Sequence, residues 1–292
     1  MNIIQVYQKF PSQKDCIDYL EQARWKGEPT CPYCHSTRTL STKAHYRHYC
    51  LNCRTSFSVT VGTIFHHTHL PLQKWFLALT LILNAKKGIS SRQLARDLEV
   101  NKSTAWRISM QIREAMGDGN QKTLLQGIVE ADETYIGGKP RKGKKNDDDT
   151  PNKRGRGTKK IAVVGMVERG GRVVAKAVKK TQLKAKDLNA LVRSHVDTKK
   201  AFLVTDEYKG YLGISKFMNH QSVNHQVWYV DGEIHTNTIE GFWALLKRGI
   251  VGQFHKVSLQ YLPKYLNEFC YRYNHRKTRN VFDLTICRGL GV

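Results

Sequence analysis

Two cysteine pairs have the spacing Cys-x-x-Cys, Cys31 with Cys34 and Cys50 with Cys53. Each such turn places two thiolates on one side of a tight knuckle, and two knuckles form a tetrahedral site typical of a zinc ribbon. Because four protein ligands leave no open coordination position, we expect one structural Zn²⁺ ion. Four ordinary buried cysteines are the alternative reading.

The residues around the knuckles are basic and polar. Three histidines could replace a thiolate, although we expect them to face solvent or phosphate: His35, His45 and His48. Three cations favour contact with DNA, with contact to protein as the rival: Lys43, Arg47 and Arg54. The seven cysteines are an odd total, and four of them pair by spacing. This pattern favours metal binding over disulfide bonds, and it therefore also favours a cytoplasmic location.

Three acidic residues could hold a second kind of metal. Asp132 lies within an expected strand, Asp206 ends an apolar run, and Glu240 borders the apolar face of an expected helix. In an open α/β sheet such a trio can hold two Mg²⁺ or Mn²⁺ ions through carboxylate oxygens. Two ions would activate water or a 3′-hydroxyl and stabilise the leaving oxygen in attack on a phosphodiester. A solvated surface acid is the alternative for each residue taken singly.

Lys247 lies on the same border of that helix as Glu240, two turns further along. It could hold a DNA phosphate near the metals, with a solvated lysine as the alternative. Several other acids compete for the metal site and rank below the chosen three: Glu130, Glu133, Glu207, Glu233 and Asp147 to Asp149.

Residues 88–116 have the pattern of a helix-turn-helix. Apolar residues recur at helical spacing in both halves, and the turn between them is short. A second helix with polar residues near its start suits the DNA major groove. The expected DNA-contacting residues are Lys102, Ser103, Thr104, Arg107 and Gln111. A plain helical hairpin in a larger core is the alternative.

The elements that must position these residues divide the chain into three parts. Residues 1–65 are expected to hold a short helix and the zinc ribbon, and residues 66–120 the helix-turn-helix domain. Residues 121–292 change to strands alternating with helices, which predicts an α/β domain. The polar, basic stretch 139–160 is expected to be a mobile loop, and residues 225–230 a strand.

Composition points to the same partner as the motifs. The chain has 292 residues, with 48 Lys and Arg against 24 Asp and Glu, a formal charge of +24. Such a charge favours an anionic partner, with nucleic acid ahead of a membrane surface. The longest apolar run, residues 75–83, is far shorter than the ~20 residues of a membrane-spanning helix, so we expect no membrane partner.

Five stretches together resemble bacterial insertion-sequence transposases of the DDE type with an N-terminal zinc ribbon. They are "CPYCHS…YCLNCRTSFSVTVGTIF", "VEADETYIGGK", "LVTDEYKGY", "HTNTIEGFWALLKRGIVGQFHKVS" and "YLNEFCYRYNHR". The resemblance reaches from about residue 25 to residue 280. Its central and C-terminal phrases are the most specific.

This resemblance implies an RNase H-like catalytic domain, a mixed sheet flanked by helices. It implies binding to terminal inverted repeats, cleavage at transposon ends, joining of the 3′-hydroxyl to target DNA, and a homo-oligomer assembled on DNA. Asp132, Asp206 and Glu240 match the three acidic positions. Some relatives use Asn with a downstream Lys at the third position, which makes Asn237 a neighbouring alternative.

Two rival functions remain. One is a transcription regulator that binds DNA through the ribbon and the helix-turn-helix without catalysis. It would need no acidic trio. The other is a nuclease or resolvase of related fold without joining activity, which only the resemblance separates from a transposase.

Overall fold

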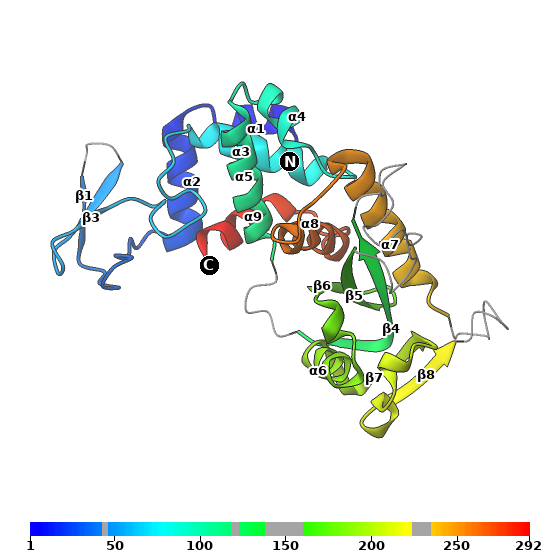
Figure 1. Ribbon diagram of the computed structural model, residues 1–292. Coiled ribbons are helices and arrows are strands. Elements are labelled where there is room, and N and C mark those ends of the chain that lie inside the picture. Colours follow the sequence, from blue (N-terminus) through cyan, green and yellow to red (C-terminus); the bar gives the residue numbers. More distant parts are fainter. Residues whose placement is uncertain (43–45, 118–122, 138–159, 224–234) are drawn as a thin grey trace. The chain divides into compact units, whose positions relative to one another are not determined.

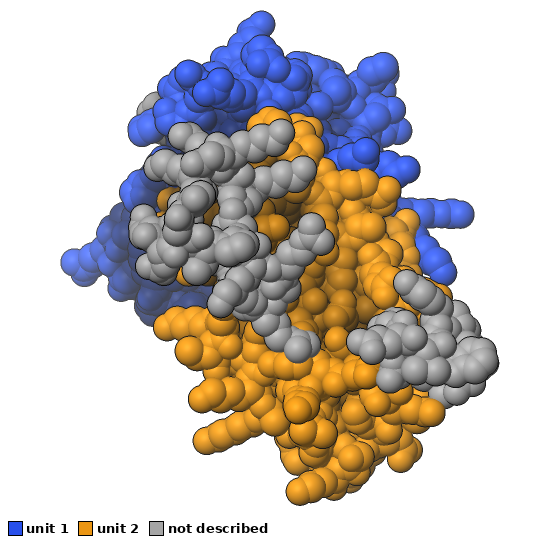
Figure 2. Space-filling view, turned by 45° about the vertical axis from the view of Figure 1, so that its right-hand side comes forward, with its two compact units in different colours: residues 1–117, 277–292 blue, residues 118–276 orange. Residues whose placement is uncertain are grey.

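The computed structural model describes residues 1–42, 46–117, 123–137, 160–223 and 235–292 (Figure 1). The chain forms two compact units, residues 1–117 with 277–292 and residues 118–276 (Figure 2). The expected loop 139–160, apart from Lys160, and the expected strand 225–230 lie outside the described residues.

Unit 2, residues 118–276, is built on a five-stranded sheet with the order β6-β5-β4-β7-β8. β4 is central; it runs antiparallel to β5 and parallel to β7, and β7 runs parallel to β8. This order and these directions are those of the RNase H-like fold, so the expected fold class is confirmed. The strands are β4 (Leu125–Ile136), β5 (Ile161–Glu168), β6 (Val173–Val178), β7 (Val196–Asp206) and β8 (Asn219–Val223).

Helices cover both faces of this sheet. The apolar core under one face includes Val129 and Ala131 of β4 with Leu188 and Val192 of α6. Side chains alternate along a strand, so the intervening residues of β4 point to the opposite face, where α7 packs on β4 and β5. The helices of this unit are α6 (Ala185–His195), α7 (Asn237–Gly249) and α8 (Leu262–Asn274).

Short turns complete unit 2. A π-helical turn, η5 (Ile250–Phe254), follows α7, and 3₁₀ turns lie on either side of α6 and β7: η2 (Lys180–Gln182), η3 (Lys209–Tyr211) and η4 (Ile214–Lys216). α8 packs on the edge strand β6, where the Asn274 side chain bonds both the N–H and the C=O of Val173, at 2.7 and 3.0 Å. This amide satisfies backbone groups that an edge strand otherwise leaves unpaired.

Unit 1 combines the ribbon with a group of helices. The helices are α1 (Ile3–Lys9), α2 (Gln13–Trp25), α3 (Leu72–Asn84), α4 (Ser91–Asp97), α5 (Lys102–Ala115) and α9 (Val281–Leu290). A small antiparallel sheet carries the cysteines, with β1 (Thr39–Thr42), β2 (Arg47–Cys50) and β3 (Ser56–Phe57) in that order. The region 66–120, expected to be the helix-turn-helix domain, contains the three helices α3, α4 and α5, with turns near Gly88 and Val100 between them.

The last helix belongs to unit 1 rather than to the sheet domain in which the sequence placed it. α9 packs against α2, α3 and α5, and the Tyr19 hydroxyl donates a hydrogen bond to Asp283. The ring of Phe282 packs against the rings of Phe10 and Phe76. Contacts so distant along the chain are not visible in sequence periodicity. The compact units also do not separate the ribbon from the helix-turn-helix at residue 65.

Among the described residues, no helix combines the length and the apolar character needed to cross a bilayer.

Candidate active site and metal centre

Two of the three predicted acids meet at one end of the sheet. Asp132 lies on β4 and Asp206 ends β7, and the preceding residues Ala131 and Thr205 are paired in the parallel ladder. Oxygens of Asp132, Asp206 and Glu133 all lie within 4.8 Å of one another. Asp132 and Asp206 therefore converge as predicted, and Glu133, ranked lower from the sequence, joins them.

Burial and like charge make this carboxylate cluster costly without a cation. Burial, with the negative charges of Glu133 and Asp206, raises the pKa of Asp132 to about 7. Three oxygen donors at this separation match the ligands that Mg²⁺ and Mn²⁺ prefer. The donor set therefore fits a divalent cation, with Asp132, Asp206 and Glu133 as the residues able to hold it.

Neighbouring groups fix two of these carboxylates. The backbone N–H of Tyr208 donates to Asp206 Oδ1 at 3.1 Å, which ties this side chain to the turn after β7. The Tyr211 hydroxyl donates to Glu133 Oε2 at 3.4 Å, and Tyr211 itself is buried. Its pKa is raised well above its usual value, first by burial and then by the charges of Glu133, Asp132 and Asp206.

Glu240, the third predicted acid, lies outside that group of three in the described structure. It is exposed in the first turn of α7 and accepts a hydrogen bond from the Thr236 hydroxyl at 3.2 Å. The helix itself reaches the cluster through Trp243, whose Nε1 donates to Asp132 Oδ2 at 2.9 Å. Glu240 and the exposed Lys247 lie about one turn before and after Trp243 on that side of α7.

A fourth acid, Glu130, holds the start of α7. Its side chain is fully buried and accepts hydrogen bonds from the backbone N–H groups of Thr238 and Ile239, at 2.8 and 2.9 Å. Arg169 Nε also donates to it at 2.7 Å. A carboxylate at a helix N-terminus satisfies donors that the helix leaves free and complements its dipole. The sequence signal for Glu130 was its position two residues before Asp132, on the same face of β4.

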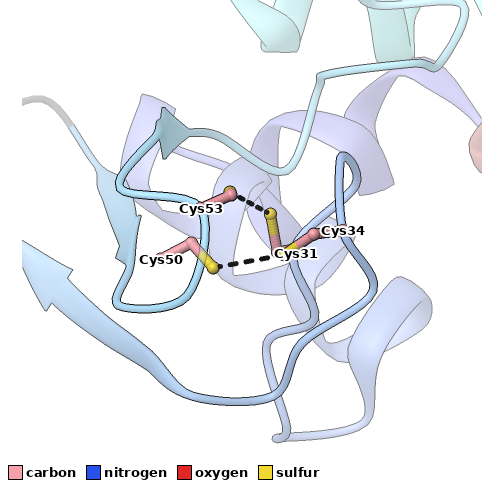
Figure 3. A group of neighbouring side chains, drawn as sticks. All are labelled: Cys31, Cys34, Cys50 and Cys53. Atoms are coloured by element: carbon pink, nitrogen blue, oxygen red, sulfur yellow. Dashed lines mark hydrogen bonds between the residues drawn. The ribbon is translucent and has the colours of Figure 1, made fainter.

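The four predicted zinc ligands lie together in the ribbon (Figure 3). The sulfurs of Cys31 and Cys53 are 3.6 Å apart and those of Cys34 and Cys50 are 3.5 Å apart, and all four lie within 4.8 Å of one another. Zn–S bonds of about 2.3 Å in a tetrahedron place sulfurs roughly 3.8 Å apart, so the thiols fit one zinc ion. Backbone N–H groups of Cys53 and Asn52 help to lower the pKa of Cys50 to about 6.

One histidine near the knuckles does not face solvent as expected. His48 is buried, with its Nε2 2.8 Å from Glu21 Oε1 and its Nδ1 3.3 Å from the Ser41 hydroxyl. It packs between the rings of Trp25 and Phe57, because β2 turns this side chain toward α2. His35 is exposed, while His45 and Lys43 lie outside the described residues.

Each helix of the helix-turn-helix begins with a side-chain cap. The Ser90 side chain accepts from the Gln93 N–H at the start of α4, and Asn101 accepts from the Thr104 N–H at the start of α5. The expected apolar residues of both helices are buried: Leu94, Ala95, Leu98, Ala105, Ile108, Ile112 and Met116. The sequence therefore predicted the elements and their buried faces correctly.

All five expected DNA-contacting residues are at least partly accessible on α5: Lys102, Ser103, Thr104, Arg107 and Gln111. Within Gln111, the Oε1 atom is buried. A hollow of about 440 Å³ beside α5 is lined by Ser103, Thr104 and Arg107 together with His67 and His69. These two histidines were not expected in the predicted interface.

Two arginines near the C-terminal end of unit 2, in the stretch "YLNEFCYRYNHR", make structural contacts. Arg276 donates to the carbonyl oxygens of Gly171 and Gly170, at 3.0 and 3.2 Å, and so holds the β5–β6 hairpin. Arg272 forms an ion pair with the buried Glu268 one turn before it, at 3.4 Å.

Comparison with known proteins gives two family matches. A model described as the ISXO2-like transposase domain matches residues 124–274, and one described as the transposase zinc-ribbon domain matches residues 11–56. The first range contains the carboxylate cluster and α7, and the second contains all four cysteines.

Individual relatives were also found. A protein described as "Uncharacterized protein in transposable element ISH50" of Halobacterium salinarum is 27% identical over 277 residues, covering 89% of this chain and 90% of the relative. Weaker likeness links the structure to a pre-cleavage Mos1 transpososome, with a TM-score of 0.31, 15% identity and 73% of each chain covered. The Mos1 strand transfer complex has a TM-score of 0.30 and 16% identity, with 74% of this chain and 73% of the other covered.

The first family model spans more than half of this chain, and it includes both aspartates that the fold brings together. The chain belongs to the ISXO2-like transposase family and carries the zinc-ribbon domain of transposases at its N-terminal end.

Proposed function

We propose that this protein binds the terminal inverted repeats of an insertion sequence and catalyses metal-dependent cleavage and transfer of DNA strands. The observation that carries this proposal is the convergence of Asp132 and Asp206, with Glu133, at one end of the sheet of a transposase domain. Transposition needs phosphodiester chemistry, and a regulator that only binds DNA needs no such buried, electrostatically costly cluster.

In this proposal Asp132 and Asp206 hold a divalent cation, Mg²⁺ or Mn²⁺, with Glu240 as the third acid. Two ions held there would activate water or a 3′-hydroxyl and would stabilise the leaving oxygen of the phosphodiester. Glu240 is preferred over Glu133 because α7, which carries it, is hydrogen-bonded to Asp132 through Trp243. Lys247, on that side of α7, would hold a DNA phosphate.

The experiment that tests the proposal maps nicks and joined products on labelled candidate terminal repeats with Mg²⁺ or Mn²⁺. We expect Asp132→Asn and Asp206→Asn to abolish cleavage while leaving end binding unchanged. Glu207→Gln is the matched control, because Glu207 is exposed beside Asp206 and outside the cluster. Full cleavage by Asp206→Asn would reject the metal site.

A second pair of variants tests which residue is the third metal-binding acid, Glu240 or Glu133. We expect Glu240→Gln to abolish cleavage and Glu133→Gln to reduce it by a smaller factor. The reverse order would assign the third position to Glu133, which already lies within 4.8 Å of both aspartates.

For DNA recognition we propose the start of α5 and the hollow beside it. Arg107 lines this hollow with His67 and His69, and its guanidinium is 3.4 Å from the His67 carbonyl oxygen. Loss of one phosphate or base contact typically costs about 1–3 kcal/mol. We expect Arg107→Ala to weaken binding to a terminal repeat by that amount, and Lys186→Ala, an exposed charge-matched control on α6, to leave it unchanged. Equal binding by both variants would remove α5 from the interface.

The zinc ribbon completes the proposed recognition surface, with one structural Zn²⁺ held by Cys31, Cys34, Cys50 and Cys53. We further propose that copies of the chain assemble on DNA, because two transposon ends must be cut and joined together. The ribbon contacts either DNA or a second copy of the chain, and crosslinking from Arg54 to a terminal repeat distinguishes the two.

A further inference from the structure

The Trp243 ring packs on the sheet directly over Gly165, where the absence of a side chain leaves room for it. Gly165 of β5 lies opposite Asp132 of β4 in the antiparallel ladder. A Cβ at Gly165 would lie 2.4 and 2.5 Å from two atoms of the Trp243 ring and 3.0 Å from Ile239 Cδ1. Real Cβ contacts do not come so close, so only glycine at position 165 admits the indole at this depth.

The seated indole makes one polar contact at the proposed metal site. Its Nε1 donates to Asp132 Oδ2 at 2.9 Å, and the side chain is only 3% exposed. Indole is a donor that carries no charge and no metal-ligating lone pair. It can therefore fix the carboxylate without competing for the cation, and its hydrogen bond uses only one of the two oxygens of Asp132.

We propose that Trp243 is a positioning residue, which orients the Asp132 carboxylate for a divalent cation and sets the depth of α7 on the sheet. Glu240 and Lys247 lie about one turn to either side of Trp243 on α7. The packing of Trp243 on Gly165 therefore also fixes the positions of these two residues relative to Asp132. The inference rests on the proposed function, because it assumes that Asp132 holds the cation. Partners that orient metal ligands typically contribute about 10–100-fold to metal affinity.

The competing role is packing alone, since the ring of Trp243 also contacts that of Phe242. Trp243→Phe and its control together separate the two roles, because both replace an indole by a smaller phenyl ring and remove an N–H donor, but only one of them does so beside Asp132. Trp75→Phe is the matched control: Trp75 is also buried, and its Nε1 donates to the Thr68 hydroxyl at 2.9 Å in unit 1, whereas the carboxylate cluster belongs to unit 2.

The test measures Mn²⁺ binding to the full-length, zinc-loaded protein without DNA, from the electron paramagnetic resonance signal of free Mn²⁺. We expect Trp243→Phe to weaken binding about 10-fold or more, Asp132→Asn to weaken it at least as much, and Trp75→Phe to leave it unchanged. Equal Mn²⁺ affinity for Trp243→Phe and the wild type overturns the inference, as does a wild type that binds no Mn²⁺.

A second measurement follows the indole N–H resonances of the wild-type protein and uses Trp243→Phe only to assign them. In the ¹⁵N-labelled wild type, the indole N–H resonance that Trp243→Phe removes is expected to shift when Mg²⁺ is added, and that of Trp75 is not. A Trp243 resonance that stays fixed while Mg²⁺ binds also overturns the inference. Because neither readout involves cleavage, a protein whose Mn²⁺ affinity depends on Asp132 and Trp243 but that cuts no DNA would reject the proposed function alone.

Discussion

At the scale of single residues, the carboxylate cluster is where stability and chemistry oppose each other. Asp132 is partly buried beside Glu133 and Asp206, and its pKa is raised from 3.8 to about 7. The folded chain without a divalent cation therefore holds a proton on Asp132 at pH values where the unfolded chain has lost it. A cation that replaces this proton removes the electrostatic cost, which ties metal binding to pH.

The sign of this linkage gives a prediction for Asp132→Asn. Between about pH 4 and pH 7 the folded state binds more protons than the unfolded state, so the free energy of unfolding falls as pH rises. A shift of about 3 units corresponds to at most about 4 kcal/mol above pH 7. We expect Asp132→Asn to stabilise unit 2 at pH 8, but not at pH 4.

The measurement is thermal unfolding of zinc-loaded protein from pH 4 to pH 8 with no Mg²⁺ or Mn²⁺ added. Glu207→Gln, which alters an exposed acid, is expected to follow the wild type across the range. A wild type whose unfolding temperature does not fall between pH 4 and pH 7 relative to Asp132→Asn would contradict the raised pKa.

At the scale of elements, α7 is held on β4 by two carboxylates from alternate positions of one strand. Glu130 binds the N–H groups that open the helix, and Asp132 accepts from the indole about one turn further on. Glu130 also forms an ion pair with Arg169, which donates onward to the His235 carbonyl oxygen at 2.9 Å. The helix that carries Glu240 is therefore anchored by polar contacts as well as by its apolar face.

Breaking this anchor should loosen α7 more than the rest of the sheet. Removing one partner of a buried ion pair costs about 3–5 kcal/mol, because the other charge is left buried. We expect Glu130→Gln to lower hydrogen-exchange protection at Thr238 and Ile239 and to reduce cleavage, with Mn²⁺ binding reduced by a smaller factor. Unchanged exchange at these two amides would show that Glu130 does not anchor the helix.

At the scale of the whole molecule, charge and zinc act over many residues at once. With 48 Lys and Arg against 24 Asp and Glu, 24 cations remain even if every acid is paired, and in the proposed function these can neutralise DNA phosphates. Each neutralised phosphate releases counterions, which makes affinity depend on salt. We expect the logarithm of the binding constant for a terminal repeat to fall linearly and steeply with the logarithm of salt concentration; a flat response would assign the charge to another partner.

Zinc is expected to act on unit 1 alone. The core cluster of the ribbon is small and consists of Cys31, Cys50 and Phe57, so we expect its fold to depend on the metal. We expect Cys50→Ser, or verified zinc removal, to abolish hydrogen-exchange protection in β1 to β3 and to weaken end binding, while β4 and β5 stay protected. Intact end binding after zinc loss would exclude the ribbon from recognition.

The sequence by itself determined the features that depend on neighbours along the chain. The Cys-x-x-Cys spacing predicted the knuckles, the apolar spacing of residues 88–116 predicted the two helices that Ser90 and Asn101 cap, and residues 127–138 were predicted as a strand that carries Asp132. These signals are local, because capping, turn geometry and side-chain periodicity act within a few residues.

Only the tertiary structure decided which distant groups meet. It brought Glu133 beside Asp132 and Asp206, gave Glu130 to the start of α7, placed Trp243 on Gly165 and returned α9 to the N-terminal unit. The physical reason is that these contacts follow from strand register and from the depth of helix packing, which depend on the summed burial of many side chains. No short stretch of the sequence carries that sum.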